Sequence, residues 1–135
     1  MTGQYSHRNK VLTLDEVLQL DQEYLVDEFH NMGYQTAMIG KWHLGCVPEG
    51  FDTFQYLSKG NGKEGEQGDY YDPCFQDKNG TIRQYDGYVT DIITDMTKNG
   101  WRTGIKNVRF LLCVITRLRM TSGNIISGMR ICFKV

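Results

Sequence analysis

The chain has 135 residues and a formal net charge of −1, with 40% hydrophobic and 23% charged residues. This length and composition predict one small globular domain with a modest core. They exclude a membrane span, because no apolar run approaches the ~20 residues that cross a bilayer. No charged-then-apolar leader follows Met1, so we expect no membrane partner and predict no localisation from the sequence itself.

The charge is unevenly distributed along the chain. All 16 acidic residues precede Asn99, and from Asn99 onward there are seven basic residues: Arg102, Lys106, Arg109, Arg117, Arg119, Arg130 and Lys134. The composition therefore divides the chain into residues 1–98 and a basic tail, 99–135. The four cysteines are widely separated, which excludes a zinc knuckle and a dense disulfide framework.

The first predicted elements are a helix and a strand. Thr13 followed by Glu16 is a capping-box pattern that predicts a helix start. Apolar residues at helical spacing then predict an amphipathic helix over Asp21–Met32. Gly33 is typical of a helix end, and the composition of Tyr34–Ile39 predicts a strand.

The next segment of the chain, residues 45–85, is predicted to be mainly loop. Residues 45–85 contain a glycine-rich polar insert, Gly60–Gly68, and several turn-forming segments. Four acidic residues of the glycine- and tyrosine-rich stretch 69–86 have the oxygen ligands that calcium binds, but they lack the regular spacing of an EF-hand loop. A solvated acidic loop is the better interpretation of these residues: Asp69, Asp72, Asp77 and Asp86. Apolar residues at i, i+3, i+4 and i+7 predict a second helix over Asp86–Lys98.

The loop that follows the strand carries the residues with chemical potential. A helix followed by a strand predicts a parallel sheet, and ligands in such sheets bind just past the carboxyl ends of the strands. There the sequence places Lys41 and His43, two residues apart and therefore on one side of an extended backbone, with Trp42 on the other. A cation beside an imidazole suits a sulfate or phosphate ester, because the ammonium stabilises anionic oxygens and the imidazole can protonate a leaving alkoxide. Taken alone, the pair is better interpreted as part of a solvated strand-end loop.

A resemblance to a known family favours the chemical interpretation. GYQTAMIGKWHLG (residues 33–45) closely resembles the second sulfatase signature, Gly-Tyr-x-Thr-x-x-x-Gly-Lys-Trp-His-Leu-Gly, at every fixed position. TGQYSHRNKV resembles the stretch after the first sulfatase signature, Cys (or Ser)-x-Pro-Ser-Arg. PEGFDTF, YYDP and GYVTDIITD resemble the family in the same order. The resemblance covers residues 1–98, which we therefore expect to be a partial sulfatase catalytic domain.

The resemblance implies an α/β fold, a fragment of the mixed sheet sandwiched by helices that alkaline-phosphatase-like and sulfatase proteins share. It implies hydrolysis of sulfate esters of small molecules or carbohydrates by a formylglycine nucleophile and a calcium ion. It gives the positions of Lys41 and His43 a role in contacting the sulfate and assisting the leaving group. Relatives of this kind are periplasmic, secreted or lysosomal.

The same resemblance places the nucleophile signature and the metal ligands outside this sequence. We therefore expect a sulfatase by family that is inactive as this chain alone. Two alternatives remain open: a non-catalytic remnant that still binds sulfated ligands, and a phosphate or phosphonate hydrolase of the same superfamily.

The basic tail has two interpretations. Its lack of acidic residues is typical of out-of-frame sequence, and in a shifted frame the codons of residues 113–122 permit Cys-His-His-Lys-Ala-Pro-His-Asp-Glu-Trp, which resembles a downstream sulfatase segment. We therefore predict that residues 99–135 are out of frame, with a junction near residues 97–99. A nucleic-acid-binding arm is disfavoured, because the basic residues are scattered and accompany an apolar run, FLLCVI, that reads as a strand. We expect no nucleic-acid partner.

Overall fold

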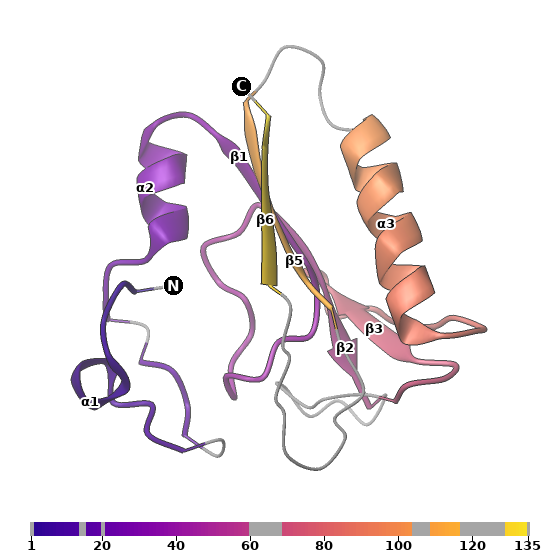
Figure 1. Ribbon diagram of the computed structural model, residues 1–135, viewed down its shortest axis with the longest axis horizontal. Helices are drawn as coiled ribbons and strands as arrows, with labels where there is room; N and C mark the ends of the chain where they lie inside the picture. The colour runs from indigo at the N-terminus through magenta and orange to yellow at the C-terminus, as the bar shows by residue number, and fades with distance from the viewer. Residues whose placement is uncertain are drawn as a thin grey trace.

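The fold is one mixed sheet with helices on both faces, seen in a computed structural model that describes residues 2–13, 16–19, 21–59, 69–103, 109–116 and 129–134 (Figure 1). The strand order is β4-β3-β2-β1-β5-β6. The strands are β1 (Gln35–Gly40), β2 (Thr53–Ser58), β3 (Cys74–Asp77), β4 (Ile82–Gln84), β5 (Phe110–Ile115) and β6 (Met129–Lys134). The helices are α1 (Ser6–Asn9), α2 (Leu25–Asn31) and α3 (Val89–Thr103).

The centre of the sheet is parallel and its outer parts are antiparallel. β1 pairs in parallel with β2 on one side and with β5 on the other. β3, β4 and β6 add antiparallel pairings at the two sides. The central strands are apolar on both faces, as strands covered on both sides must be. The expected α/β mixed sheet sandwiched by helices is confirmed.

Each face of the sheet has its own apolar core. One core lies on the α2 side and consists of Val26, Met38, Trp42, Phe51, Phe54, Tyr56, Leu111 and Cys113. The other lies under α3 and consists of Ile39, Leu57, Phe75, Val89, Ile93, Leu112 and Val114. Figure 1 shows α2 and α3 on opposite sides of the sheet. Alternate residues of β1 and β5 thus serve opposite cores, as the two-residue period of a strand requires.

The first helix is shorter than the sequence predicts. The structure has α2 at Leu25–Asn31 and no helix at its expected start near Asp21. The backbone N–H of Tyr24 donates to the carboxylate of Asp27 at 2.9 Å, so the helix begins where this carboxylate closes its first turn. The Thr13–Glu16 pattern likewise forms half of a capping box, since Glu16 accepts the N–H of Thr13 at 3.1 Å, but residues 16–19 are not helical.

The prediction of a mainly loop region over residues 45–85 missed three strands, β2, β3 and β4. These strands are short and their burial does not alternate regularly, since β2 ends in three buried residues and β4 has none. Their stability comes from pairing across the sheet rather than from their own composition. β3 and β4 form a hairpin in which the Asp77 carboxylate accepts the N–H groups of Asn79 at 2.9 Å and Thr81 at 3.0 Å. The glycine-rich insert, 60–68, lies outside the described residues.

The second predicted helix and the apolar run of the tail are both present. α3 begins three residues later than predicted and runs to Thr103, past the expected boundary at residue 98. The run FLLCVI is β5, a strand with buried residues at its centre. Residues 104–108 and 117–128 lie outside the described residues, and the predicted change of reading frame stays a prediction. No helix in the part of the chain that the structure describes is long and apolar enough to cross a membrane.

Candidate active site

The loop that carries Lys41 and His43 begins at the carboxyl end of the central strand. β1 ends at Gly40, which pairs with Tyr56 of β2 and Ile115 of β5. The strands β2, β1 and β5 are parallel, so their carboxyl ends meet at one edge of the sheet. This is the edge at which open α/β sheets bind ligands.

The entry to the loop requires glycine. Gly40 has φ of +117°, and a Cβ there would overlap the carbonyl oxygen of Ile115 and lie 2.8 Å from its carbonyl carbon. The same carbonyl oxygen accepts the backbone N–H of Lys41 at 2.8 Å. β5 therefore holds the backbone of Lys41 directly, and only a residue without a side chain fits at position 40.

Trp42 closes the loop from the core side. Its side chain is 5% exposed and packs edge-on against Phe51, with ring centroids 6.3 Å apart. Its indole N–H donates to the carbonyl oxygen of Cys46 at 2.8 Å. Lys41 and His43 are each partly buried, an alternation of burial that agrees with the expected placement of Trp42 on the opposite side of the backbone.

The far end of the loop is held by the segment that precedes α2. The backbone N–H of Leu18 donates to the carbonyl oxygen of Leu44 at 3.0 Å. Gly45 has φ of +67°, and a Cβ there would lie 2.9 Å from Cγ2 of Val17.

Tyr24 packs against the core on the α2 side of the sheet. Burial raises the pKa of its phenol, and the nearby Cys46, Asp21 and Asp27 raise it further. The phenol therefore stays neutral and donates to the carbonyl oxygen of Gln19.

Two further polar residues that the sequence patterns do not indicate lie at this edge. Lys59 follows β2 and Thr116 follows β5, so both lie at the carboxyl edge with Lys41 and His43. The residue patterns do not indicate them, because β2 lies in the stretch predicted to be loop and β5 lies in the basic tail. The signal that finds them is the parallel pairing of β1 with its two neighbours.

The described residues do not form a metal site by themselves. Among the described ranges, no group of three or more His, Cys, Asp or Glu residues is placed to hold a metal ion. Two of the acidic residues considered in the sequence analysis serve turns instead, since Asp72 accepts the N–H of Gly87 at 2.7 Å and Asp77 closes the β3–β4 hairpin. The described residues therefore do not supply the ligand set of the calcium ion that the family resemblance implies.

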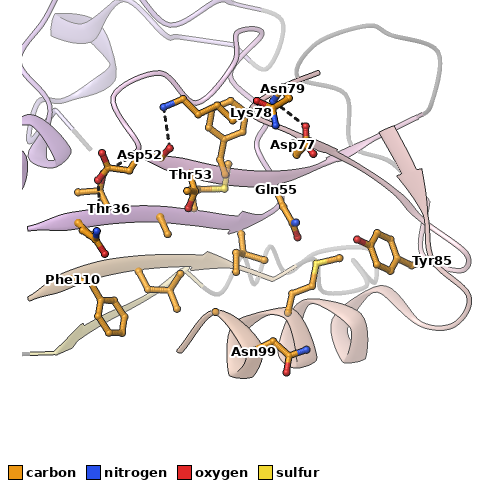
Figure 2. A pocket seen from close by; sticks show the side chains of 18 residues that line it. Thr36, Asp52, Thr53, Gln55, Asp77, Lys78, Asn79, Tyr85, Asn99 and Phe110 are labelled. Atoms are coloured by element: carbon orange, nitrogen blue, oxygen red, sulfur yellow. Dashed lines mark hydrogen bonds between the residues drawn. The ribbon is translucent and has the colours of Figure 1, made fainter. Parts of the chain in front are cut away.

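A groove of about 750 Å³ lies elsewhere, on the α3 side of the sheet (Figure 2). Its walls come from β1, β2, β5, the β3–β4 hairpin and α3, and they include Gln35, Gln55, Asp77, Asn99 and Phe110. Neither Lys41 nor His43 lines it. The groove reaches the amino-terminal ends of β1 and β5, whereas ligand sites in such sheets follow the carboxyl ends, so we do not take it as the active site.

Asp52 also lines the groove, and its contacts connect several elements (Figure 2). Its carboxylate accepts the backbone N–H of Thr36 at 2.7 Å, the Thr36 hydroxyl at 3.1 Å and a ring nitrogen of His30 at 2.9 Å. Lys78 donates to its backbone carbonyl at 2.9 Å. Burial raises the pKa of the Asp52 carboxyl, but the hydrogen bonds from Thr36 and His30 together outweigh burial, so the pKa is lowered.

Comparison with known proteins identifies the family. The sulfatase family model matches residues 1–113. The chain belongs to the sulfatase family. The match continues 15 residues past residue 98, where the sequence motifs end the resemblance to sulfatases.

The relatives are sulfatases several times longer than this chain. It is 42% identical over 112 residues to an N-acetylglucosamine-6-O-sulfatase of Bacteroides thetaiotaomicron, a match that covers 83% of this chain and 19% of that sulfatase. It is 38% identical over 86 residues to arylsulfatase J of Mus musculus, covering 58% of this chain and 13% of the mouse protein. The chain thus spans about a fifth or less of the curated sulfatases it matches.

A solved structure shares the fold. It describes a protein in complex with its substrate D-glucosamine-2-N,6-O-disulfate, and it matches with a TM-score of 0.76 and 40% identity over 86% of this chain and 22% of that chain. The mixed sheet described above is therefore a part of the sulfatase fold.

Proposed function

We propose that this chain supplies the sulfate-contacting loop of an enzyme that hydrolyses sulfate esters. The observation that carries the proposal is the loop after β1, which presents Lys41 and His43 at the carboxyl edge of the sheet and is anchored on both sides. In a member of the sulfatase family, such a loop is suited to a tetrahedral anion.

The two side chains have different parts in the proposed reaction. The Lys41 ammonium neutralises sulfate oxygens, whose charge is retained as the ester bond breaks. The His43 imidazole donates a proton to the leaving alkoxide or stabilises it by a hydrogen bond. A formylglycine nucleophile and a calcium ion remain expectations from the family resemblance, with the ion supplying further neutralisation of the sulfate when bound.

The substrate class follows from the relatives. One relative is named an N-acetylglucosamine-6-O-sulfatase, and the related structure holds a sulfated glucosamine as its substrate. We therefore propose a sulfated carbohydrate, with sulfated glucosamine as the first ligand to test.

Binding of glucosamine 6-O-sulfate to the purified chain tests the proposal. We expect Lys41→Ala and His43→Ala each to weaken the affinity about tenfold, because each removes a charge-assisted or hydrogen-bonded contact to the anion. The matched controls are Lys98→Ala and His7→Ala, whose side chains are exposed on α3 and α1. NMR titration of the three histidine rings is a suitable readout. Equal affinities in wild type, the two loop variants and the controls would contradict the proposal.

The alternatives are separated by two further assays. Hydrolysis of an aryl sulfate by the purified chain in calcium would exclude a non-catalytic remnant, whereas binding without turnover would support one. A phosphate or phosphonate hydrolase predicts a preference for glucosamine 6-phosphate over the 6-sulfate. We expect the reverse preference.

A further inference from the structure

Trp42 lies between the two proposed sulfate-contacting residues and faces away from solvent. Its ring fills part of the core on the α2 side, in edge-on contact with Phe51. Filling a core requires only an apolar ring of suitable size. The hydrogen bond from the indole N–H to the carbonyl oxygen of Cys46 is a separate feature that a phenylalanine would not provide.

This hydrogen bond closes the segment between residues 42 and 46 into a turn. The bond is buried and 2.8 Å long, and a buried carbonyl left without a donor is costly. His43 lies inside the closed segment. Lys41 lies outside it, where its backbone is held by the carbonyl of Ile115 at 2.8 Å. The two candidate residues are therefore anchored by different contacts.

We infer that Trp42 is a positioning residue for His43: its indole N–H, by binding the Cys46 carbonyl, sets the turn on which the imidazole stands. The inference deepens the proposed function, on which it rests for its relevance to sulfate. In the ligand-free chain, loss of the indole N–H must also loosen the turn, and this effect is independent of sulfate.

The ligand-free test is hydrogen exchange in Trp42→Phe, which keeps an aromatic ring and removes the donor. The reporter is the amide of Leu18, which donates to Leu44 inside the turn at 3.0 Å. The internal reference is the amide of Thr36, which donates to Asp52 outside the turn. We expect exchange at Leu18 to accelerate about fivefold relative to Thr36, the loss expected for one hydrogen bond.

Phe75→Leu is the matched control for lost core packing. Phe75 is 2% exposed and also packs edge-on against an aromatic ring, that of Tyr85, but it belongs to the core on the opposite face of the sheet. We expect it to lower the melting temperature without changing the ratio of exchange at Leu18 and Thr36. If both variants change this ratio equally, or neither does, Trp42 is a core residue only and the inference is wrong.

The second arm uses inorganic sulfate as the probe, followed through the His43 ring signals. We expect Trp42→Phe to weaken sulfate binding about fivefold and to shift the His43 signals, while the Lys41 backbone signals stay close to wild type. Phe75→Leu should bind as wild type. An equal disturbance of Lys41 and His43 would overturn the separate anchoring that the inference requires.

A second measurement, on the wild-type chain, serves if Trp42→Phe does not fold. Because the indole N–H of Trp42 and the Leu18 amide both bind carbonyls of this turn, they should exchange with similar protection if the indole closes the turn. An indole N–H that exchanges far faster than the Leu18 amide would overturn the inference. If wild type binds no sulfate while Leu18 still responds to Trp42→Phe, the proposed function fails and the positioning role of Trp42 stands.

Discussion

At the scale of single residues, Gly40 is the position where the sequence has least freedom. Its positive φ and the closeness of the Ile115 carbonyl leave no room for a Cβ. We predict that Gly40→Ala lowers the free energy of unfolding by several kcal/mol, about 3 or more, because backbone strain adds to a clash with the neighbouring strand. Denaturant unfolding measures this loss.

Gly80 provides the control for the Gly40 prediction. It also has positive φ, +79°, but an added Cβ there would meet nothing within 4 Å. Gly80→Ala should therefore cost only about 1 kcal/mol, the strain of the left-handed conformation. Equal costs for the two substitutions would show that contact with Ile115 is unimportant.

Asp52 gives a prediction on pH. Its folded-state pKa is lowered, so its contribution to stability is present above the unfolded pKa of about 3.9 and is lost as the pH falls through the folded pKa. We predict that Asp52→Asn lowers the free energy of unfolding at pH 7 by about 1 kcal/mol, a modest value because the side chain is partly exposed. The difference from wild type should shrink below about pH 4.

The measurement for Asp52 is chemical denaturation at several values between pH 7 and pH 3. Asp95→Asn is the control, because its side chain is 73% exposed and contacts only Lys98 at 3.4 Å among the described ion pairs. It should leave both the stability and its pH dependence close to wild type. A difference between Asp52→Asn and wild type that grows as the pH falls would have the wrong sign for a lowered pKa.

At the scale of elements, helical periodicity predicted α3 correctly, whereas the sequence patterns did not predict the short strands β2, β3 and β4. The apolar spacing that predicted a helix from residue 86 corresponds to α3, where Val89 and Ile93 are fully buried against the sheet. β2, β3 and β4 carry no comparable pattern, and their pairing partners are far away in the sequence. The helix ends were also shifted, because caps such as the Asp27 carboxylate depend on local geometry.

The packing of α3 yields a prediction at this scale. Ile93→Ala should lower the free energy of unfolding by about 2–5 kcal/mol, because it opens a cavity in the core between the helix and the sheet. Thr94→Ala is the control on the exposed side of the same helix, and it should change stability by about 0.5 kcal/mol or less. Thermal melts of both variants distinguish a packed α3 from a helix that merely lies near the sheet, for which the two would behave alike.

At the scale of the whole molecule, the chain corresponds to a part of the fold of a longer sulfatase, since it matches 22% of the related structure. The family match reaches residue 113, and β5, which includes that residue, is the parallel partner of β1. The predicted change of reading frame concerns residues 99–135, which include β5 and β6.

Resequencing the gene tests that prediction. We expect a single-base change near the codon of Lys98 to restore a frame that encodes His-His-Lys-Ala-Pro-His downstream. The same sequence, read upstream of Met1, should contain an in-frame Cys or Ser-x-Pro-Ser-Arg. A confirmed reading that encodes residues 99–135 as given would contradict the frame prediction and leave β5 and β6 as native strands.

The sequence by itself determined the family, the main helix of the α3 side, the strand β1 and the candidate residues Lys41 and His43, because these depend on local spacing and on one long motif. Only the tertiary structure decided that β5 is the neighbour of Gly40, that Trp42 binds the Cys46 carbonyl, and that Asp52 joins α2 to β1. These contacts join residues through sheet pairing, loop curvature and core packing, which no pattern of neighbouring residue types specifies. The physical reason is that the residue type determines the chemistry of a side chain, whereas the tertiary structure determines which groups that side chain contacts.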